Sequence, residues 1–453
     1  MERYDLIVIG AGSAARDAAQ KAAKEYRAKV ALIESTRWGG SCPNVACKPT
    51  KAYLVAAELH RDLRVNGTRW GLDAPARADL ARIHAWKENL RKPQPKWVEE
   101  LRSNGFDTFE GKAGFVDPRT VRVDGRELVG DRILIATGSR TAVPPIPGLP
   151  EDWVDHVTAL DLEELPESML VLGGGPVGLE FAQIFARFGT RVTVVQAPAR
   201  IAPRSDADAA EELAAALEEE GIEIITGTTV EHFEGRTAIL ENGRTVEAQT
   251  VFLASGRAPN VEDLGLDRVG VKTRRAGIEV NERMRTNVSG IWAAGDVTGI
   301  AQFTPIAQYQ ARIAVEGMFA PNGHAADYSI LPTAIFTDPE LGGVGLTEHE
   351  ARERGLDVEI STHPVAHVTR SQYVTEKHGV YKLVYERDSR RVLGIHVVSR
   401  NASDIVQGFA LALRFGATVD DLAGAHHIYP SWGEGVKAAA EKTRPAPAWA
   451  AVS

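Results

Sequence analysis

The sequence predicts an α/β protein with two Rossmann-like domains, followed by a separate α+β domain toward the C-terminus. One observation is a strand, glycine turn, helix and strand in succession near the N-terminus. A second is the return of the same pattern later in the chain. A third is a change from about Leu331, where strand-like runs precede one long helical run.

The first βαβ unit occupies the N-terminal segment. YDLIVIG is a short apolar run, GAGSAAR is a glycine-rich turn, AARDAAQKAAKEY is helical in composition, and AKVALIE is a second strand. A strand, helix and strand in this order form a parallel pair, so the unit predicts a parallel sheet.

The second unit and the C-terminal domain are predicted in the same way. SMLVLGGG is a strand and turn, PVGLEFAQIFARFG a helix, and TRVTVVQ a strand. Between the two units, TVRVDGRELVGDRILIATGS predicts strands joined by turns. In the last domain, VYKLVYERD and VLGIHVVS predict strands, and SDIVQGFALALRFG predicts a helix.

Length and composition exclude several classes of protein. A chain of 453 residues predicts two to four domains. A net charge of −9 argues against a nucleic-acid partner. No apolar run approaches the roughly 18 residues of a membrane helix, and the N-terminus lacks the pattern of a signal peptide. We therefore expect a cytoplasmic protein with no membrane partner.

The first glycine turn has the order of a dinucleotide-binding fingerprint. Gly10 makes the tight turn, Gly12 lets the backbone approach a pyrophosphate, and the small Ala15 allows close packing of the helix on the sheet. Glu34 ends the second strand, where a carboxylate can accept hydrogen bonds from ribose hydroxyls. Strand, turn, helix, strand and acid all occur in order, which favours a nucleotide site.

The second fingerprint differs from the first at the end of its second strand. Gly173, Gly175 and Gly178 form the turn, but the strand ends in Gln196 rather than in an acid. A missing carboxylate removes repulsion against a 2′-phosphate, and Arg200 and Arg204 lie further along the loop. This pattern favours NADPH over NADH, although both arginines are equally compatible with ordinary surface positions.

The segment WGGSCPNVACKPTK carries both cysteines of the chain, Cys42 and Cys47. At the start of one helix, this spacing would bring the two sulfurs together on one turn, where the helix N-terminus stabilises a thiolate. Lys51 follows one turn later and adds positive charge. A zinc site would need two more ligands, and His60 is the nearest histidine. Two unrelated buried cysteines are a further alternative, but the position between two nucleotide units favours a redox pair.

Together these motifs give the chain a strong resemblance to a known family. The chain resembles the class I pyridine nucleotide-disulfide oxidoreductases, the group of glutathione reductase, dihydrolipoamide dehydrogenase and mercuric reductase. The resemblance covers nearly the whole chain. Its motifs, in order, are GAGSAAR, GGSCPNVACKPTK, ATGS, GGGPVGLE, LASGRAPN, WAAGDVTG, FTDPELGGVGLTE and YPSWGEG.

The resemblance implies two bound cofactors, FAD and a nicotinamide nucleotide. The residues implied for FAD are Gly10, Gly12, Ser13, Ala14, Glu34, Gly40, Ser41, Lys51, Ala113, Thr137, Gly138, Ser139 and Asp296. Those implied for NADPH or NADH are Gly173, Gly175, Gly178, Gln196, Arg200 and Gly256. No metal ligands are implied.

The resemblance also implies a route for electrons and an order of domains. Cys47 would be the sulfur on the flavin side, Cys42 would attack the substrate, and Lys51 would pair with Glu180 near the flavin. The chain would act as a homodimer, with partner residues completing the site. The implied domains are 1–147 for FAD, 148–260 for NAD(P), 261–328 as a central domain, 329–446 for dimerisation, and 447–453 as a flexible tail.

One motif departs from the pattern of the disulfide reductases. Most carry a histidine where this chain has Tyr429, five residues before Glu434. A phenol is a poor base at neutral pH, but it can donate a proton. Mercuric reductases are similar in having tyrosine here, yet they also use C-terminal cysteines that this chain lacks. His426 and His427 lie just upstream. In a strand, His427 would share a face with Tyr429 and could supply the missing base, but a structural role for this histidine is favoured.

The sequence therefore predicts an FAD-dependent NAD(P)H oxidoreductase that passes electrons through Cys42 and Cys47 to a disulfide or another thiol-reactive acceptor. Tyr429 would protonate or stabilise the leaving group, and Glu434 would orient the segment around it. One alternative is a metal-ion reductase of the mercuric reductase kind. Another is a flavin-binding partner protein that has lost catalysis. No motif identifies the acceptor.

Overall fold

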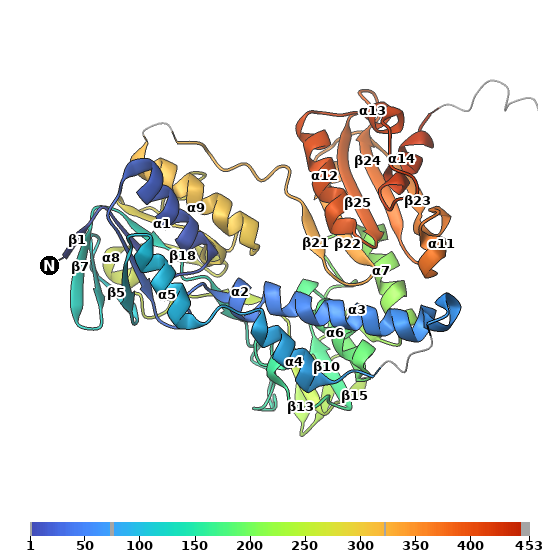
Figure 1. The fold of residues 1–453 in the computed structure, drawn as a ribbon, viewed down its shortest axis with the longest axis horizontal. Coiled ribbons are helices and arrows are strands. Elements are labelled where there is room, and N and C mark those ends of the chain that lie inside the picture. Colours follow the sequence, from blue (N-terminus) through green and yellow to red (C-terminus); the bar gives the residue numbers. More distant parts are fainter. Residues whose placement is uncertain (1, 73–76, 321–322, 445–453) are drawn as a thin grey trace, which may run out of the picture. The chain divides into compact units, whose positions relative to one another are not determined.

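The computed structural model describes residues 2–72, 77–320 and 323–444, so the tail expected at 447–453 lies outside the described residues (Figure 1). The chain divides into two compact units. Unit 1 contains residues 1–50, 85–142 and 256–327, and unit 2 contains residues 51–84, 143–255 and 328–453. The finer boundaries expected for four domains stay predictions.

A parallel sheet of five strands forms the centre of unit 1. Its strand order is β20 (Ile291–Ala293), β8 (Ile133–Ile135), β2 (Leu6–Ile9), β3 (Val30–Glu34) and β4 (Asp107–Glu110). Strand β2 pairs with β3 from Leu6 opposite Val30, and with β8 from Ile7 opposite Ile133. The predicted Rossmann-like arrangement is confirmed in this unit.

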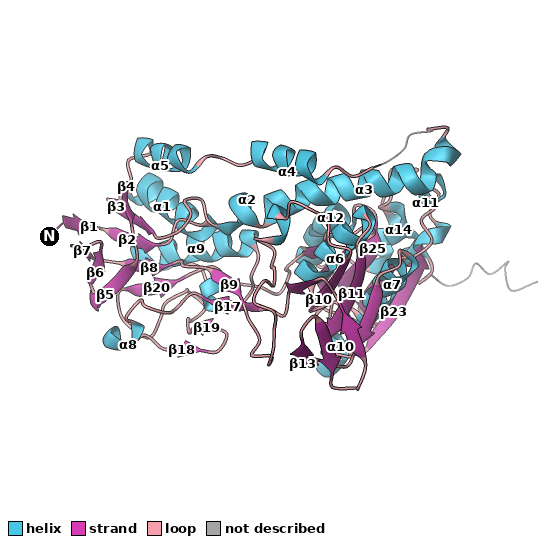
Figure 2. Cartoon of the chain, turned by 90° about the horizontal axis from the view of Figure 1, so that it is seen from below, coloured by secondary structure: helices cyan, strands magenta, loops and turns pink. Residues whose placement is uncertain are grey.

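Alternation along β2 sends side chains to two apolar cores, one on each face of the sheet. Leu6 and Val8 belong to the core beneath helices α1 (Ser13–Tyr26), α5 (Gln94–Ser103) and α9 (Thr304–Phe319). Ile7 and Ile9 belong to the core shared with a second sheet of β1 (Glu2–Tyr4), β7 (Arg126–Gly130), β6 (Thr120–Val123) and β5 (Ala113–Asp117). Figures 1 and 2 both show α1 beside α9.

Short elements complete unit 1. They are α2 (Ser41–Val45), β9 (Ser139–Thr141), β17 (Arg257–Pro259), α8 (Leu266–Val269), β18 (Thr273–Arg274), β19 (Gly277–Ile278) and the 3₁₀ turn η2 (Asp296–Thr298). Two helices span a boundary between the units along the chain. They are α3 (Cys47–Trp70), which starts in unit 1, and α4 (Leu80–Asn89), which starts in unit 2.

Unit 2 repeats the parallel arrangement in its first part. The sheet has the order β12 (Glu223–Thr226), β11 (Arg191–Gln196), β10 (Ser168–Leu172) and β16 (Thr250–Leu253). Helices α3, α6 (Pro176–Phe188) and α7 (Ala207–Glu219) contribute to the core on one face. On the other face lie β13 (Val230–Glu234), β14 (Thr237–Leu240) and β15 (Thr245–Glu247). The second βαβ unit is therefore confirmed.

The last part of unit 2 is the expected α+β domain. Its antiparallel sheet has the order β21 (Thr333–Ile335), β22 (Glu340–Gly345), β25 (Val392–Ser399), β24 (Val380–Glu386) and β23 (Val358–Pro364). Three helices toward its C-terminal end are α12 (Ala402–Arg414), α13 (Val419–Gly424) and α14 (Glu434–Glu441). Short elements in unit 2 are η1 (Ala159–Asp161), α10 (Glu348–Glu353), η3 (Val365–His367) and α11 (Ser371–Val374).

A cluster of buried ion pairs ties the two parts of unit 2 together. Asp338 lies 2.9 Å from the guanidinium of Arg187 and 3.3 Å from that of Arg400. Arg400 also lies 2.7 Å from Asp62 on α3 and 3.5 Å from Glu376. Burial raises the pKa of Asp338, but the two arginines outweigh it and hold that pKa below its usual value. For Glu376, burial and the negative charge of Asp338 raise the pKa to about 7.

This raised pKa predicts that stability depends on pH through Glu376. Between roughly pH 4.3, where an unfolded glutamate titrates, and pH 7, the folded chain holds a proton that the unfolded chain has lost. The Glu376 contribution to stability is therefore full at low pH and decreases as pH rises through this window, by at most about 4 kcal/mol. Glu376→Gln should lack that decrease.

The measurement is the midpoint temperature of unfolding for the wild type and Glu376→Gln at several values between pH 5 and pH 8. The variant should gain stability relative to the wild type as pH rises. Glu218→Gln, at an exposed position on α7, is the matched control and should give no such relative gain. Parallel pH profiles for the wild type and Glu376→Gln would contradict the assignment.

Candidate active site

The glycine turn before α1 forms a cradle of backbone groups. Gly10 has φ +113°, and a Cβ on it would lie 2.3 Å from the carbonyl oxygen of Ala136. Gly12 is the N-cap of α1 and provides no side-chain cap, and no acidic residue lies in the first helical turn. The free N–H groups at this helix start therefore favour a negatively charged ligand such as a pyrophosphate. Ser13 and Ala14 are the first two helical residues.

Glu34 ends β3 and holds the glycine turn. One carboxylate oxygen accepts a hydrogen bond from the backbone N–H of Ala11 at 2.9 Å. The other oxygen accepts hydrogen bonds from the N–H groups of Ser35, Thr36 and Arg37 at 2.8–3.2 Å. The structure thus places this acid beside the cradle, at the end of the second strand of the βαβ unit.

The loop before the cysteines packs directly on this cradle. A Cβ on Gly40, which has φ +75°, would lie 2.4 Å from the Cα of Gly12. The side chain of Asn44 donates to the carbonyl oxygens of Trp38 at 3.0 Å and of Gly40 at 2.7 Å, which closes the loop. Gly40 is the N-cap of α2, so two helix starts lie against one another through two glycines.

The sequence predicted that both cysteines lie at the start of one helix, but in the structure they lie on two separate helices. Cys42 is the second residue of α2, and Cys47 is the first residue of α3, with Ala46 between them at φ −128°, ψ −103°. The reason is Pro49, whose ring would clash with the carbonyl of Val45 in a continuous helix. A proline is tolerated in the first turn of a new helix, so the chain restarts at Cys47.

Each cysteine lies in the first turn of a helix, where the dipole favours a thiolate. Cys42 is half-buried and Cys47 is exposed. The Sγ of Cys47 lies 3.7 Å from the Oγ1 of Thr304, the first residue of α9. Sequence reasoning missed Thr304, because it is distant in the chain and no motif links it to the cysteines.

A second network joins the ATGS and AAGD motifs within unit 1. Ser139 donates to Asp296 at 2.6 Å, and Arg257 donates to the Oγ of Ser139 at 2.7 Å. Thr137 donates to the carbonyl oxygen of Asn260 at 2.6 Å, and the Asn260 amide donates back at 2.9 Å. Arg257 and Asn260 belong to LASGRAPN, a motif that sequence reasoning recognised only through its glycine.

The remaining residues expected around FAD, apart from Lys51, are also in unit 1. Ser41 is the first residue of α2, and Ala113 is the buried first residue of β5. Gly138 has φ +72°, and a Cβ on it would meet nothing within 4 Å. Gly256, which was expected around the nicotinamide nucleotide, also falls in unit 1; it has φ +125° and the same open surroundings. Their conformations suit glycine, but their surroundings alone assign them no ligand.

Lys51 and Glu180 form an ion pair in unit 2. The ammonium donates to both carboxylate oxygens, at 3.0 and 2.8 Å. The Glu180 side chain is only 8% exposed, so it is not a solvated helix residue. It also accepts a hydrogen bond from the backbone N–H of Phe336 at 3.1 Å, and the Lys51 ammonium lies 4.2 Å from the centre of the Phe336 ring. Phe336, in the TDPE region, was not predicted.

The glycine turn before α6 forms a second cradle. A Cβ on Gly173 would lie 2.4 Å from the carbonyl oxygen of Ala254, and one on Gly178 would lie 1.8 Å from the carbonyl oxygen of Gly173. Gly175 is the N-cap of α6, again without a side-chain cap. These contacts exclude any side chain at Gly173 and Gly178, and they leave the helix N-terminus open to a ligand.

Gln196 and Arg200 both bind the backbone of their own loop. The Oε1 of Gln196 accepts a hydrogen bond from the N–H of Gly174 at 2.7 Å. The guanidinium of Arg200 donates to the carbonyl oxygens of Pro203 at 3.1 Å and Ser205 at 3.2 Å. Arg204 is exposed.

The segment of Tyr429 is held by Glu434. The carboxylate accepts hydrogen bonds from the N–H groups of Thr369 and Ser431, both at 3.2 Å. Tyr429 is 72% exposed, and its hydroxyl lies 3.1 Å from the Oγ1 of Thr369. Thr369 was missed by sequence reasoning, which had no motif in that region.

The segment of His426 and His427 is not a strand. The segment has no regular structure, so the alternation of side chains that would place His427 with Tyr429 does not exist. The ring of His427 instead stacks on Phe409, with centroids 6.2 Å apart. Burial lowers the pKa of His427.

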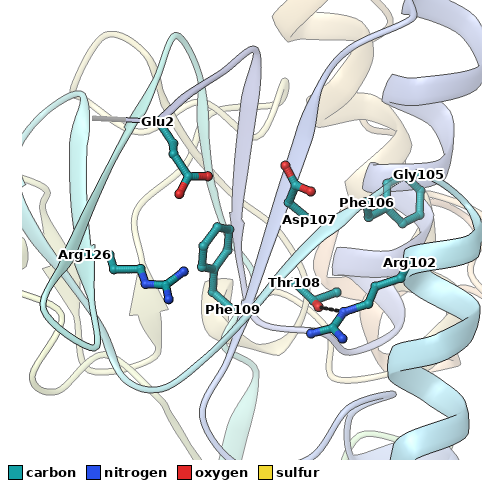
Figure 3. Close-up of a pocket in the computed structure, with 8 residues that line it drawn as sticks. All are labelled: Glu2, Arg102, Gly105, Phe106, Asp107, Thr108, Phe109 and Arg126. Carbon is teal, nitrogen blue, oxygen red and sulfur yellow. Dashed lines mark hydrogen bonds between the residues drawn. The ribbon is translucent and has the colours of Figure 1, made fainter.

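A polar hollow of about 430 Å³ lies elsewhere in unit 1, at the start of the edge strand β4 (Figure 3). It is lined by Glu2, Arg102, Gly105, Phe106, Asp107, Thr108, Phe109 and Arg126. The Nε of Arg102 donates to Thr108 at 2.8 Å across this hollow. Because β3 and β4 are parallel, the hollow is at the opposite end of the strands from Glu34 and the glycine cradle. It is therefore separate from the candidate site.

The two glycine cradles fit dinucleotides, because each combines a close backbone approach with an uncapped helix start. Comparison with known proteins agrees with this geometry. A family profile described as "Pyridine nucleotide-disulphide oxidoreductase" matches residues 4–311, and one described as its "dimerisation domain" matches residues 331–440. The chain belongs to the pyridine nucleotide-disulphide oxidoreductase family. Its members are NAD(P)H-dependent flavoprotein oxidoreductases, and the redox-active pair in this one is Cys42 and Cys47.

Relatives within the family match over most of their length. A mercuric reductase from Staphylococcus aureus is 38% identical over 96% of this chain and 82% of its own. A dihydrolipoyl dehydrogenase from Thermus scotoductus is 36% identical over 97% of each chain. Among solved structures, the HOCl-induced flavoprotein disulfide reductase RclA from Escherichia coli is 30% identical with a TM-score of 0.87, over 97% of this chain and all of its own. No helix in the described residues is long and apolar enough to cross a membrane.

The contact between Gly40 and Gly12 predicts that Gly40→Ala impairs FAD binding. The new methyl group would displace the α1 N-terminus in addition to straining the backbone at φ +75°. Affinity of the apoprotein for FAD should fall about tenfold or more, measured by flavin fluorescence titration. Gly105→Ala is the matched control, because Gly105 has φ +85° but open space around its Cβ position. Full affinity in Gly40→Ala would contradict the role of this contact.

Proposed function

We propose that the protein is a cytoplasmic, homodimeric, NADPH-dependent reductase of a small disulfide or another thiol-reactive electrophile. The observation that carries the proposal is the pair Cys42 and Cys47, each in the first turn of a helix, with the loop before Cys42 packed on the first glycine cradle. Both positions favour thiolates, and the thiolate is the reactive form of cysteine in disulfide exchange.

When bound, FAD supplies the relay of two electrons from the nicotinamide to the disulfide. The chain then carries out the exchange with its own sulfurs. Cys42 attacks one sulfur of the acceptor disulfide, which releases the first thiolate and leaves a mixed disulfide. Cys47 attacks the sulfur of Cys42, which releases the second thiolate and restores the Cys42–Cys47 bond. Two electrons and two protons thus convert one acceptor disulfide into two thiols.

Tyr429 is the proposed proton donor to the leaving thiolate, and it reaches the site from the second copy in the dimer. Its exposure leaves the hydroxyl accessible, and the two backbone hydrogen bonds to Glu434 fix the segment that carries it. Exposed Leu411, Phe415 and Ile428 in the same domain support a surface that a second copy covers. The match to a dimerisation domain supports the same arrangement.

Lys51 and Glu180 are proposed to act as a charged pair beside the cofactor. Glu180 fixes the ammonium of Lys51 one helical turn after Cys47 on α3, where it adds positive charge near the helix start. We propose for FAD and nicotinamide binding the same residues that the family resemblance implies for each cofactor.

NADPH is the proposed electron donor. The end of β11 carries Gln196, whose amide binds the glycine turn, and therefore no carboxylate repels a 2′-phosphate there. The exposed Arg204 remains available to pair with that phosphate, whereas Arg200 already donates to two carbonyl groups of its loop. The structure therefore favours Arg204 over Arg200 as the phosphate partner.

A metal-ion reductase is the second candidate. Tyr429 favours it, because mercuric reductases resemble this chain at that position, and a mercuric reductase is 38% identical to it. A solved relative, RclA, has been crystallised as a Cu(II) complex. The sequence has no cysteine after Cys47 that would deliver a soft metal ion, which argues against a metal-ion reductase.

The two functions are separated by steady-state assays of the purified holoenzyme with NADPH or NADH, and with small disulfides, Hg²⁺ or Cu²⁺ as acceptors. We expect turnover with disulfides, a lower KM for NADPH than for NADH, and loss of disulfide reduction in Cys42→Ser by at least about a hundredfold. Tyr429→His should increase disulfide reduction near neutral pH, because an imidazole exchanges protons there.

Two outcomes would overturn the proposal. Unchanged disulfide turnover in Cys42→Ser would show that electrons leave by another route. Turnover with the metal ions alone would establish the second candidate. Lys24→Met, a substitution at an exposed position on α1, is the matched control for effects of purification and folding on activity.

A further inference from the structure

The loop that leads into Cys42 is packed against a tryptophan. Gly39 has φ +91°, and a Cβ on it would lie 2.6 Å from the indole of Trp97 on α5. Trp97 is only 7% exposed. Its ring faces two cations, since the guanidinium of Arg16 lies 4.5 Å and the ammonium of Lys92 lies 4.1 Å from its centre. The indole therefore holds Arg16 next to the loop of the redox pair.

Arg16 occupies the first turns of α1, close to Cys42. It is the fourth residue of the helix, and its N–H donates to the carbonyl oxygen of Gly12 at 3.0 Å. Since Gly12 is in contact with Gly40, this part of α1 faces the start of α2, where Cys42 is the second residue. Burial lowers the pKa of Arg16, and the negative charges of Glu100, Cys42 and Asp17 act in the opposite direction.

The guanidinium of Arg16 is incompletely satisfied. Its Nε is buried and has no hydrogen-bond partner. A buried donor without a partner costs free energy, and a charged donor costs more than a neutral one. In the disulfide state the sulfur of Cys42 is neutral, so its electrostatic attraction to the Arg16 guanidinium is weak. A thiolate on Cys42 would supply the missing negative charge.

We propose that Arg16 is a positioning residue that keeps the sulfur of Cys42 in its thiolate form once the Cys42–Cys47 bond has been reduced. The inference rests on the proposed function, in which that sulfur attacks the acceptor. A permanent cation next to the nucleophile makes attack independent of a proton acceptor nearby.

Most members of the family have a histidine that can accept the thiol proton, but this chain has Tyr429 at that position. A phenol is protonated at neutral pH and cannot accept the thiol proton. Helix α2 has only five residues, so its dipole alone is a modest source of stabilisation. The other charged groups around Arg16 are Glu100 and Asp17, which oppose a thiolate, and Lys92, which reinforces it. Arg16 is the cation of this group that faces the cysteine loop.

The test uses holoenzyme carrying Cys47→Ser, which leaves Cys42 as the sole cysteine of the chain. The rate of alkylation by iodoacetamide is measured from pH 5 to pH 10 and followed by mass spectrometry. With Arg16 present, the midpoint of the rate profile should lie below the ordinary cysteine value of about 8.5. Arg16→Met should raise the midpoint by about one pH unit or more, which is a roughly tenfold slower reaction at pH 6.

Two further variants distinguish an electrostatic role from a purely structural one. Arg16→Lys retains the charge and should keep the midpoint close to that of the parent. Lys24→Met removes an exposed cation from the same helix about 12 Å further along, and should leave the midpoint unchanged. If Arg16→Met loses stability, Arg16→Gln takes its place, because it removes the charge but keeps a polar side chain, and it should raise the midpoint in the same way.

Equal midpoints in the parent, Arg16→Met and Arg16→Lys would overturn the inference. Alkylation requires no turnover, so this result can be separated from a failure of the proposed function. Loss of disulfide reduction in Cys42→Ser with equal alkylation midpoints would reject the role of Arg16 alone. A raised midpoint in Arg16→Met with unchanged turnover in Cys42→Ser would support the role of Arg16 and reject the proposed electron route.

Discussion

The close approach of Gly40 to Gly12 is the contact on which the redox site depends. It places the start of α2, which carries Cys42, directly against the start of α1, which forms the first nucleotide cradle. Any side chain at Gly40 would push the two helix starts apart. Two positive helix ends thus meet, one at the proposed pyrophosphate site and the other at Cys42. The same contact places the start of α2 against the first turn of α1, which includes Arg16.

Much of the fold could be predicted because its signals are local. The runs around Leu6–Ile9 and Ser168–Leu172 are short, apolar strands followed by glycine turns and helices, and the structure has these elements. The break between the cysteines was not predicted, although Pro49 marks it in the sequence. The position of His427 relative to Tyr429 could not be predicted, because so short a segment has no pattern that specifies a strand or a loop.

Three further site residues were not predicted, for a different reason. Thr304, Phe336 and Thr369 contact Cys47, Glu180 and Glu434 respectively, but each is far from its partner along the chain. The spacing of residues in a motif predicts the local backbone conformation of a glycine turn. Contacts between distant segments depend instead on how the sheets and helices pack. Arg16 lay inside the first glycine motif, yet only the structure links it to Trp97 and to the cysteine loop.

The central claim is that Cys42 and Cys47 form the electron exit, and an anaerobic reductive titration with dithionite tests it most directly. The wild-type holoenzyme should take up about four electrons per chain, two by the cofactor and two by the disulfide, whereas Cys42→Ser should take up about two. Free thiol counts should rise by two in the wild type alone. Equal electron uptake by both proteins would contradict the account.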